Sequence, residues 1–440
     1  MNIVEFGGSE TPSPEFPATR VAARVPVEQG QNIPEQASQL RIALQNAERL
    51  VVDAWGATLR GSDAPASHQV RLPQGRLPPA LVDALGLVLH HAGLFLEGLR
   101  AVADALREQI RELPDEALLL SQLHAQVGAL APRLEAVHAC TALLLQEPEP
   151  GGVPPAKWFH LERNDRALVV RAHASPLLPG AMLRSQLWPF VRGAVLTSAT
   201  LTGCGSFDFF LAEVGLKGHP GVATLQVASP FDYARQGTLV AHATQAPPRD
   251  VAAFTSEMIE ALLTDLEQVQ AGALVLFTSR EQMRLAVDAL PAALRERVLV
   301  QGQQPRHRLL MRHRERVAAG RASVVFGMQS FGEGLDLPGA QCESLFITKL
   351  PFAPPDAPVD EARAEWLRAS GGDPFMQLVL PATALRLAQW VGRAIRTEDD
   401  HAHVYCYDKR LLHTGYGQRL LRGLPAFRLL ERAPMAAAAQ

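Results

Sequence analysis

The chain has 440 residues, enough for two or three domains, and a formal net charge of -3. Only four of its 42 basic residues are lysines. This balance excludes binding to nucleic acid through an overall basic charge, so any contact with a phosphate backbone depends on local groups of arginines. The first ten residues have neither the basic region nor the apolar run of a signal peptide.

Residues 1–38 are rich in Pro, Ser and Gly, which predicts a disordered or extended N-terminal lead. Residues 39–150 carry leucines at helical spacing, which predicts a domain of three or more long antiparallel helices. These leucines are Leu40, Leu44, Leu50, Leu81, Leu85, Leu89, Leu94, Leu99, Leu119, Leu123, Leu130 and Leu134. The apolar stretch 81–99 is interrupted by acidic residues and histidines, so we expect a core helix and no membrane span.

Residues 147–155 (EPEPGGVPP) mark a break. The segments WFHLE and ALVVRAH then alternate like a hairpin, and GAVLTSATL (193–201) predicts a buried strand that ends in a polar turn. From residue 206 to the end, strands and helices alternate, which predicts a parallel sheet with helices on both faces. Ligands of such sheets bind beyond the carboxyl ends of the strands. FTSR (277–280) and SFGEGLDL (330–337) follow two strands, so we expect the site there.

The segment QWVGRAIR places two arginines, Arg393 and Arg396, three residues apart. On a helix this spacing puts both guanidinium groups on one face. Because arginine binds phosphate oxygens with two parallel hydrogen bonds, such a pair suits a triphosphate. A solvated pair on a surface helix is the alternative, and three further segments in a fixed order count against it.

Together, AVLTSATL (194–201), ALVLFTSREQM (273–283), VVFGMQSFGEGLDL (324–337) and QWVGRAIR resemble helicase motifs III, IV, V and VI of the superfamily 2 DinG/XPD-like DNA helicases. The resemblance implies an α/β fold with a RecA-like parallel-sheet helicase C-terminal domain at 206–440. It also implies an arch-like helical domain at 39–150 and a remnant of the first RecA-like motor domain at 151–205. The implied activity is ATP-driven, 5′ to 3′ unwinding of DNA by a cytoplasmic, nucleoid-associated bacterial enzyme of DNA repair.

The resemblance also implies roles for single residues. The motif VI arginines would reach the transferred phosphoryl group of ATP, with Gln389 orienting the motif. Residues on the nucleotide side would be Glu333, Gly334, Asp336 and Gly392; those that couple nucleotide state to movement would be Ser198, Ala199 and Thr200; those on DNA would be Phe277, Thr278, Ser279, Arg280, Gln329 and Ser330. Asp336 has a structural alternative, as a cap or an ion pair with a motif VI arginine. For Arg306, His307 and Arg308 a solvated helix start is favoured over contact with DNA.

The sequence contains no GK[ST], so it has no phosphate loop with its lysine and Mg²⁺-binding hydroxyl. Two acidic runs, Asp115-Glu116 and Asp360-Glu361, do not follow buried strands and are predicted to begin helices. The four cysteines are widely spaced, which predicts neither a zinc site nor an iron–sulfur cluster. We therefore expect ATP and Mg²⁺ to be held mainly by a first motor lobe that these residues do not supply, and no metal here.

Two hypotheses follow. The chain is the C-terminal part of a DNA helicase, acting on single strands and duplex junctions and completed by a separate first motor lobe. Alternatively it is a non-catalytic nucleic-acid-binding module, or a half-motor without its own ATPase.

Overall fold

The structure, a computed structural model, describes residues 2–6, 33–59, 65–147, 152–164, 168–332, 334–353 and 357–433. It consists of two compact units. One, the helical unit, comprises Met1–Leu178 and Pro355–Gly372, and the other, the sheet unit, comprises Pro179–Pro354 and Asp373–Gln440. The predicted domain boundaries at residues 150 and 205 do not coincide with those of the two units, which fall after residues 178, 354 and 372.

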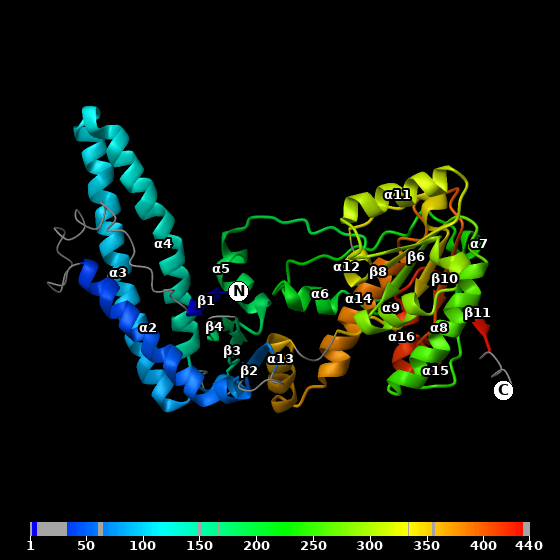
Figure 1. Cartoon of the computed structure of the whole chain (residues 1–440), viewed down its shortest axis with the longest axis horizontal. Coiled ribbons are helices and arrows are strands. Elements are labelled where there is room, and N and C mark those ends of the chain that lie inside the picture. The colour runs from blue at the N-terminus through cyan, green and yellow to red at the C-terminus, as the bar shows by residue number, and fades with distance from the viewer. Residues whose placement is uncertain are drawn as a thin grey trace. The chain divides into compact units, whose positions relative to one another are not determined.

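Three long helices dominate the helical unit, as the leucine spacing predicted: α2 (Ile33–Trp55), α3 (Pro79–Glu112) and α4 (Ala117–Leu145). Helices α3 and α4 form a hairpin and run side by side (Figure 1). The turn between them is a short 3₁₀ helix, η3 (Pro114–Glu116), which carries the first of the two acidic runs. Helix α3 is long and apolar enough to cross a membrane, but it buries residues such as Leu85 and Ala92 in the core shared with its neighbours.

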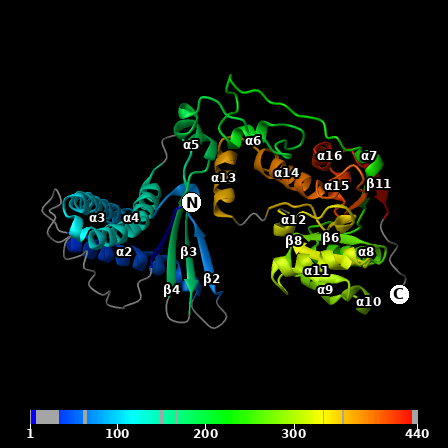
Figure 2. The same ribbon diagram turned by 90° about the horizontal axis from the view of Figure 1, so that it is seen from above.

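A four-stranded antiparallel sheet completes the core of the helical unit (Figure 2). Its strands, in the order β1-β4-β3-β2, are β1 (Asn2–Phe6), β4 (Leu168–Ser175), β3 (Ala156–Arg163) and β2 (Ser67–Arg71). The predicted hairpin is confirmed as β3 and β4. It pairs inside this separate sheet, however, and not with the parallel strands of the sheet unit.

The N-terminal lead is shorter than the predicted 1–38. Strand β1 pairs with β4 and helix α2 begins at Ile33, while residues 7–32 lie outside the described residues. Helix α13 (Pro358–Ala369) also belongs to the helical unit although its sequence lies between motifs V and VI. Arg71 of β2 donates hydrogen bonds to Glu361 at 2.9 Å and Glu365 at 2.6 Å on this helix.

The sheet unit contains a seven-stranded parallel sheet in the order β11-β5-β10-β9-β6-β8-β7. The strands are β5 (Gly237–His242), β6 (Gly272–Phe277), β7 (Val298–Val300), β8 (Ser323–Met328), β9 (Ser344–Ile347), β10 (Ala402–Cys406) and β11 (Arg428–Arg432). Side chains of successive residues alternate between two cores. Leu274 and Leu276 of β6 point to one, and Val275 and Phe277 to the other.

Helices cover both faces of this sheet, as predicted. They are α8 (Val251–Glu267), α9 (Arg280–Asp288), α10 (Ala292–Arg295), α11 (Arg306–Ala318), α12 (Gln329–Gly332), α14 (Leu380–Val391), α15 (Arg410–His413) and α16 (Gly415–Arg422). Residues of α8 and α9 line one core, and residues of α11 and α14 line the other. A π-helical turn, η6 (Phe375–Val379), leads into α14, and η5 (Gly339–Cys342) precedes β9.

The first part of the sheet unit, residues 179–236, has little regular structure beyond α5 (Pro179–Gln186), η4 (Trp188–Phe190), α6 (Asp208–Glu213) and α7 (Tyr233–Gln236). The prediction of a buried strand at 193–201 is wrong for this structure. That segment is extended but exposed, with Val195 92% accessible. Residues 192–202 make no backbone–backbone hydrogen bond with any described residue, and a strand needs such a neighbour.

Candidate functional site

The loop that follows β8, residues 332–338, is positioned by apolar anchors on either side of two glycines. Phe331, Leu335 and Leu337 are each at least 96% buried. Gly332 lies against the helix that carries the first residues of motif VI, because a Cβ atom there would be 2.0 Å from Nε1 of Trp390. Gly334 has a φ of +68°, which favours glycine. The sequence thus folds the motif V loop tightly against α14.

The two arginines of motif VI do not lie on a helix, contrary to the prediction. Helix α14 ends at Val391, and Gly392 caps it, so Arg393 and Arg396 lie in the turns that follow. Their side chains consequently diverge. Arg393 is half-buried and donates from Nε to the carbonyl oxygen of Gly332 and from Nη1 to that of Leu335.

Arg396 remains near the same loop but is more exposed. Its Nε lies 3.9 Å from a carboxylate oxygen of Asp336, and the two side chains are 41% and 77% accessible. A pair this open contributes little to stability. The ion pair between Asp336 and Arg396 that the sequence offered as an alternative is therefore a weak contact. The guanidinium of Arg396 remains accessible to solvent. Glu333, the other predicted acidic residue of the loop, lies outside the described residues.

A buried carboxylate fixes the backbone of the Arg396 turn. Asp400, 7% accessible, accepts hydrogen bonds from Arg396 N at 2.7 Å, Thr397 N at 2.9 Å and Thr397 Oγ1 at 2.7 Å. Burial raises the pKa of Asp400, but these hydrogen bonds and one from the Gly339 backbone outweigh it, and the pKa lies below its usual value. Gln236, 2% accessible, donates to three carbonyl oxygens of the same turn, including that of Asp400. Sequence reasoning missed both residues.

Two arginines of α11 also reach the motif V loop. Arg306 donates from Nη2 to the carbonyl oxygen of Gly334 at 3.0 Å, and its guanidinium carbon lies 5.3 Å from the centre of the Phe331 ring. Arg314 donates from Nη2 to the carbonyl oxygen of Asp336 at 3.2 Å. Arg306, His307 and Arg308 are exposed at the start of α11, as the expectation of a solvated helix start predicted, and Arg306 in addition contacts the motif V loop.

The predicted coupling and orienting residues are in contact with each other. Nε2 of Gln389 donates to Oγ1 of Thr200 at 3.3 Å, and the Thr200 backbone N donates to Oγ of Ser198 at 3.3 Å. Ala199 lies between them on the exposed segment. Gln389 thus joins motif VI to motif III, whereas the prediction had it orient motif VI itself.

The predicted DNA-contacting residues follow two neighbouring strands. In the register of β6 and β8, Phe277 pairs with Met328, so the segments that follow both strands leave the sheet at one edge. Phe277 itself is fully buried and packs on Phe326 with ring centres 5.1 Å apart. This corrects the expectation that its side chain contacts nucleic acid.

The remaining residues of this edge are accessible or partly so: Thr278, Ser279, Arg280, Gln329 and Ser330. Ser279 caps α9 by accepting from Gln282 N at 3.4 Å. Gln301, which sequence reasoning missed, donates to Oγ of Ser330 at 3.1 Å and accepts from Met328 N at 2.7 Å. Hydroxyl, amide and guanidinium donors at one sheet edge suit phosphate oxygens.

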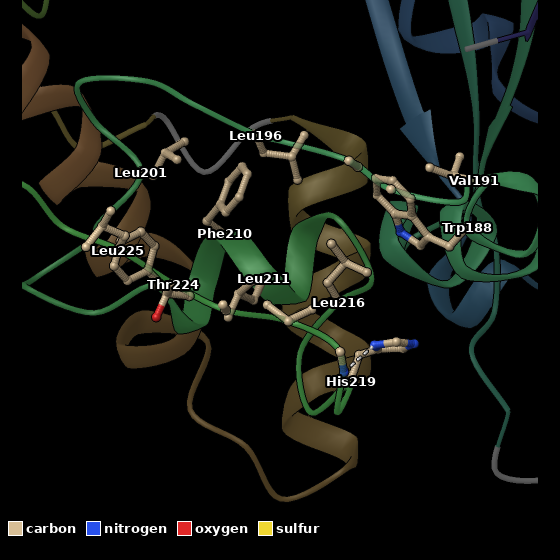
Figure 3. A pocket seen from close by; sticks show the side chains of 16 residues that line it. Trp188, Val191, Leu196, Leu201, Phe210, Leu211, Leu216, His219, Thr224 and Leu225 are labelled. Carbon is tan, nitrogen blue, oxygen red and sulfur yellow. Dashed lines mark hydrogen bonds between the residues drawn. The ribbon is translucent and has the colours of Figure 1, made fainter.

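A groove of about 340 Å³, lined by apolar side chains and by polar atoms, lies beside α6 (Figure 3). We call it the strand-edge groove; its lining includes Trp188, Val191, Leu196, Leu201, Phe207, Phe210, Leu211, Leu216 and Leu225. Two extended segments, 193–201 and 222–228, border it, and Val195, Leu225 and Val227 are 92%, 82% and 78% accessible. Residues 223–231 also make no backbone–backbone hydrogen bond with the described part of the chain.

The described residues contain no group of three His, Cys, Asp or Glu side chains placed to hold a metal ion. The motif V and VI side of the site carries mainly arginine side chains. It fits the phosphates of a nucleotide, because guanidinium groups are its dominant charges.

Known proteins that are similar to this chain include helicases. The family described as "Helicase C-terminal domain" matches residues 262–427. The ATP-dependent DNA helicase DinG of Photobacterium profundum is 37% identical over 361 residues, which are 81% of this chain and 52% of the relative. The protein of the same name from Escherichia coli (strain K12) is 33% identical over 368 residues, 81% of this chain and 50% of the relative.

The chain spans about half the length of these curated relatives. The solved structure titled "Structure of S. tokodaii Xpd4" shares the fold, with a TM-score of 0.50 at 14% identity, over 94% of this chain and 69% of that chain. The chain therefore carries a helicase C-terminal domain and is similar to DinG helicases over most of its own length.

Proposed function

We propose that this chain is the second motor lobe and helical domain of an ATP-dependent DNA helicase that unwinds duplexes in the 5′ to 3′ direction. The observation that carries the proposal is the arrangement of the motif VI arginines beside the motif V loop, at a sheet edge that also presents hydroxyl, amide and guanidinium groups. ATP and Mg²⁺ would be held mainly by a first lobe that carries the phosphate loop.

In such a two-lobed motor the chemistry consists of positioning and charge stabilisation. Closure of the cleft would bring a guanidinium from this chain against the transferred phosphoryl group, a contribution worth about 10³–10⁵ in rate. The hydrogen bond between Thr200 and Gln389 would couple closure of the cleft to movement of the rest of the lobe. The donors at the ends of β6 and β8 would hold the DNA backbone.

The strand-edge groove supports the idea of a separate first lobe. Its two bordering segments combine exposed apolar side chains with unpaired backbone groups. Unpaired extended edges bind further strands, and apolar area of this kind is usually covered. We infer that a sheet of the first lobe pairs with residues 193–201 and 222–228.

The test combines the chain with the half of the Photobacterium profundum relative that the match leaves uncovered. We expect co-elution of the two and ATPase activity that single-stranded DNA stimulates, while the 440-residue chain alone hydrolyses little or no ATP. The double variant Val195→Asp/Leu225→Asp should abolish association. Val251→Asp, at an exposed apolar residue of α8 away from the groove, should not.

Two outcomes would contradict the proposal. One is a robust DNA-stimulated ATPase from the chain alone that Arg393→Ala abolishes. The other is a stable complex of the two halves with no ATPase above that of the relative's half by itself. DNA binding that persists in that second case would favour the competing function, a non-catalytic nucleic-acid-binding module, which the missing phosphate loop also allows.

A further inference from the structure

The carbonyl oxygens of the motif V loop are held by arginines from two elements. Those of Gly332 and Leu335 accept from Arg393, which follows α14, and that of Asp336 accepts from Arg314 on α11. The carbonyl oxygen of Gly334 accepts from Arg306, also on α11. Four of the five residues from 332 to 336 are therefore fixed through their main chain.

These hydrogen bonds restrict the conformational freedom of the loop. Glycines at 332 and 334 give the backbone more freedom than other residues would. A site that must meet a phosphate group works only when its supporting residues hold it near the productive geometry. Guanidinium groups suit this task because their planar fork bonds two acceptors at once. Arg393 does so across a span of three residues.

The two arginines of motif VI differ in what their guanidinium groups do. Arg393 uses Nε and one terminal nitrogen on loop carbonyls and is half-buried. The side chain of Arg396 donates no hydrogen bond within the described part of the chain. Its closest carboxylate, that of Asp336, is 3.9 Å away and itself open to solvent. The backbone of Arg396, by contrast, is fixed by Asp400.

We propose that these arginines have separate tasks: Arg396 is the guanidinium that contacts phosphate, whereas Arg393, together with Arg314 of α11, is a positioning residue that holds the motif V loop. The proposal deepens the proposed function and rests on it for the phosphate contact. It adds α11, which lies outside the four motifs, to the elements that shape the site (Figure 1).

The first measurement needs no ATPase. Phenylglyoxal modifies accessible guanidinium groups, and peptide mapping of the wild-type 440-residue chain gives the rate at each arginine. We expect Arg396 to react at least about tenfold faster than Arg393, because a guanidinium that is hydrogen-bonded and partly buried is protected. Equal rates at the two positions would overturn the division.

The second measurement follows hydrogen exchange at residues 331–337. Arg393→Ala and Arg314→Ala should each speed exchange by about tenfold or more, because local opening governs exchange. Arg393→Lys should resemble Arg393→Ala, since one ammonium group cannot bridge two carbonyls. Arg396→Ala should leave exchange unchanged. The matched control is Arg308→Ala, an exposed arginine of α11 without a hydrogen bond to any described residue.

The third measurement uses the chain combined with the relative's first lobe. Arg396→Ala should lower kcat at least about 100-fold with little change in KM, and Arg396→Lys should retain more activity than the alanine variant. If Arg393→Ala and Arg396→Ala lower kcat equally and neither alters loop exchange, the division of tasks is refuted while the proposed function stands. If the wild-type combination hydrolyses no ATP, both the proposed function and the phosphate contact of Arg396 are refuted. The positioning role of Arg393 and Arg314 is then tested by phenylglyoxal labelling and hydrogen exchange, which need no ATPase.

Discussion

Replacing Asp400 should destabilise the sheet unit by an amount that follows from the burial and the hydrogen bonds of its carboxylate. The carboxylate accepts two backbone N–H groups and one hydroxyl in a place that is 7% accessible. Hydrogen bonds to a charged acceptor contribute about 1.5–3 kcal/mol each, and neutral ones about 1 kcal/mol. In Asp400→Asn the amide oxygen can still accept from both N–H groups, and the Thr397 hydroxyl can accept from the amide.

The asparagine variant therefore loses the charge but keeps the bonds, and we expect a loss of about 2 kcal/mol. Asp400→Ala loses these three bonds and the one from the Gly339 backbone and leaves their N–H groups without this acceptor, so a loss of about 5 kcal/mol is expected. For a domain of this size each kcal/mol corresponds to about 2–4 °C in Tm. Asp400→Asn should thus lower Tm by about 4–8 °C. The exposed neighbour provides the control, since Asp399→Asn should change stability by about 0.5 kcal/mol or less.

The pH dependence gives a second check on the same residue. The pKa of Asp400 in the folded chain lies below its usual value, and that of the unfolded chain is about 3.9. The stabilisation is thus complete well above pH 4 and disappears as pH falls through the folded pKa. The difference in Tm between wild type and Asp400→Asn should be constant from about pH 8 to pH 5 and shrink below about pH 4. Equal Tm values for Asp400→Asn and Asp399→Asn, measured by circular dichroism near neutral pH, would refute this reasoning.

Three further predictions concern other contacts. Gly332→Ala should lower the free energy of unfolding, measured in urea, by about 3 kcal/mol because its Cβ would overlap Trp390. The control Gly86→Ala, with open space around the new Cβ, should raise the free energy of unfolding by about 0.5–1 kcal/mol. Equal losses of stability in the two variants would contradict the prediction. Burial raises the pKa of Cys342 and of Cys406 to about 12, so iodoacetamide at about pH 8 should label neither in the native chain, as mass spectrometry would report. Arg71→Ala should lower the thermal stability of the helical unit by about 1–2 kcal/mol, and Arg100→Ala, in an exposed pair, by about 0.5 kcal/mol or less.

Periodicity and order along the chain were enough to predict most of the fold. Leucines at helical spacing located α2, α3 and α4, and apolar runs between polar turns located the strands of the parallel sheet. Both acidic runs begin helices, as expected from the charge preference of helix N-termini. These features depend on local sequence and on burial, which one segment reveals by itself.

The predictions failed where the outcome depends on a neighbour in space. The apolar segment 193–201 has the composition of a buried strand, but composition cannot supply the strand that must lie beside it. The hairpin of β3 and β4 was recognised, yet its sheet was not, because its partner β2 lies far earlier in the sequence. The place of helix α13 in the helical unit could not be predicted either, because its contacts with Arg71 and Trp158 involve residues far earlier in the sequence.

Motif VI illustrates the same limit at the site itself. Spacing of three residues predicts one helical face, and that inference depends on the helix continuing through Arg396. The helix ends at Val391, so the same spacing turns Arg393 toward loop carbonyls and leaves Arg396 open. Sequence therefore identified both residues but not their difference, which arises from the place where α14 stops and from Asp400 four residues beyond Arg396. A pair of identical side chains in one motif can thus differ in burial and hydrogen bonding because the backbone between them changes direction.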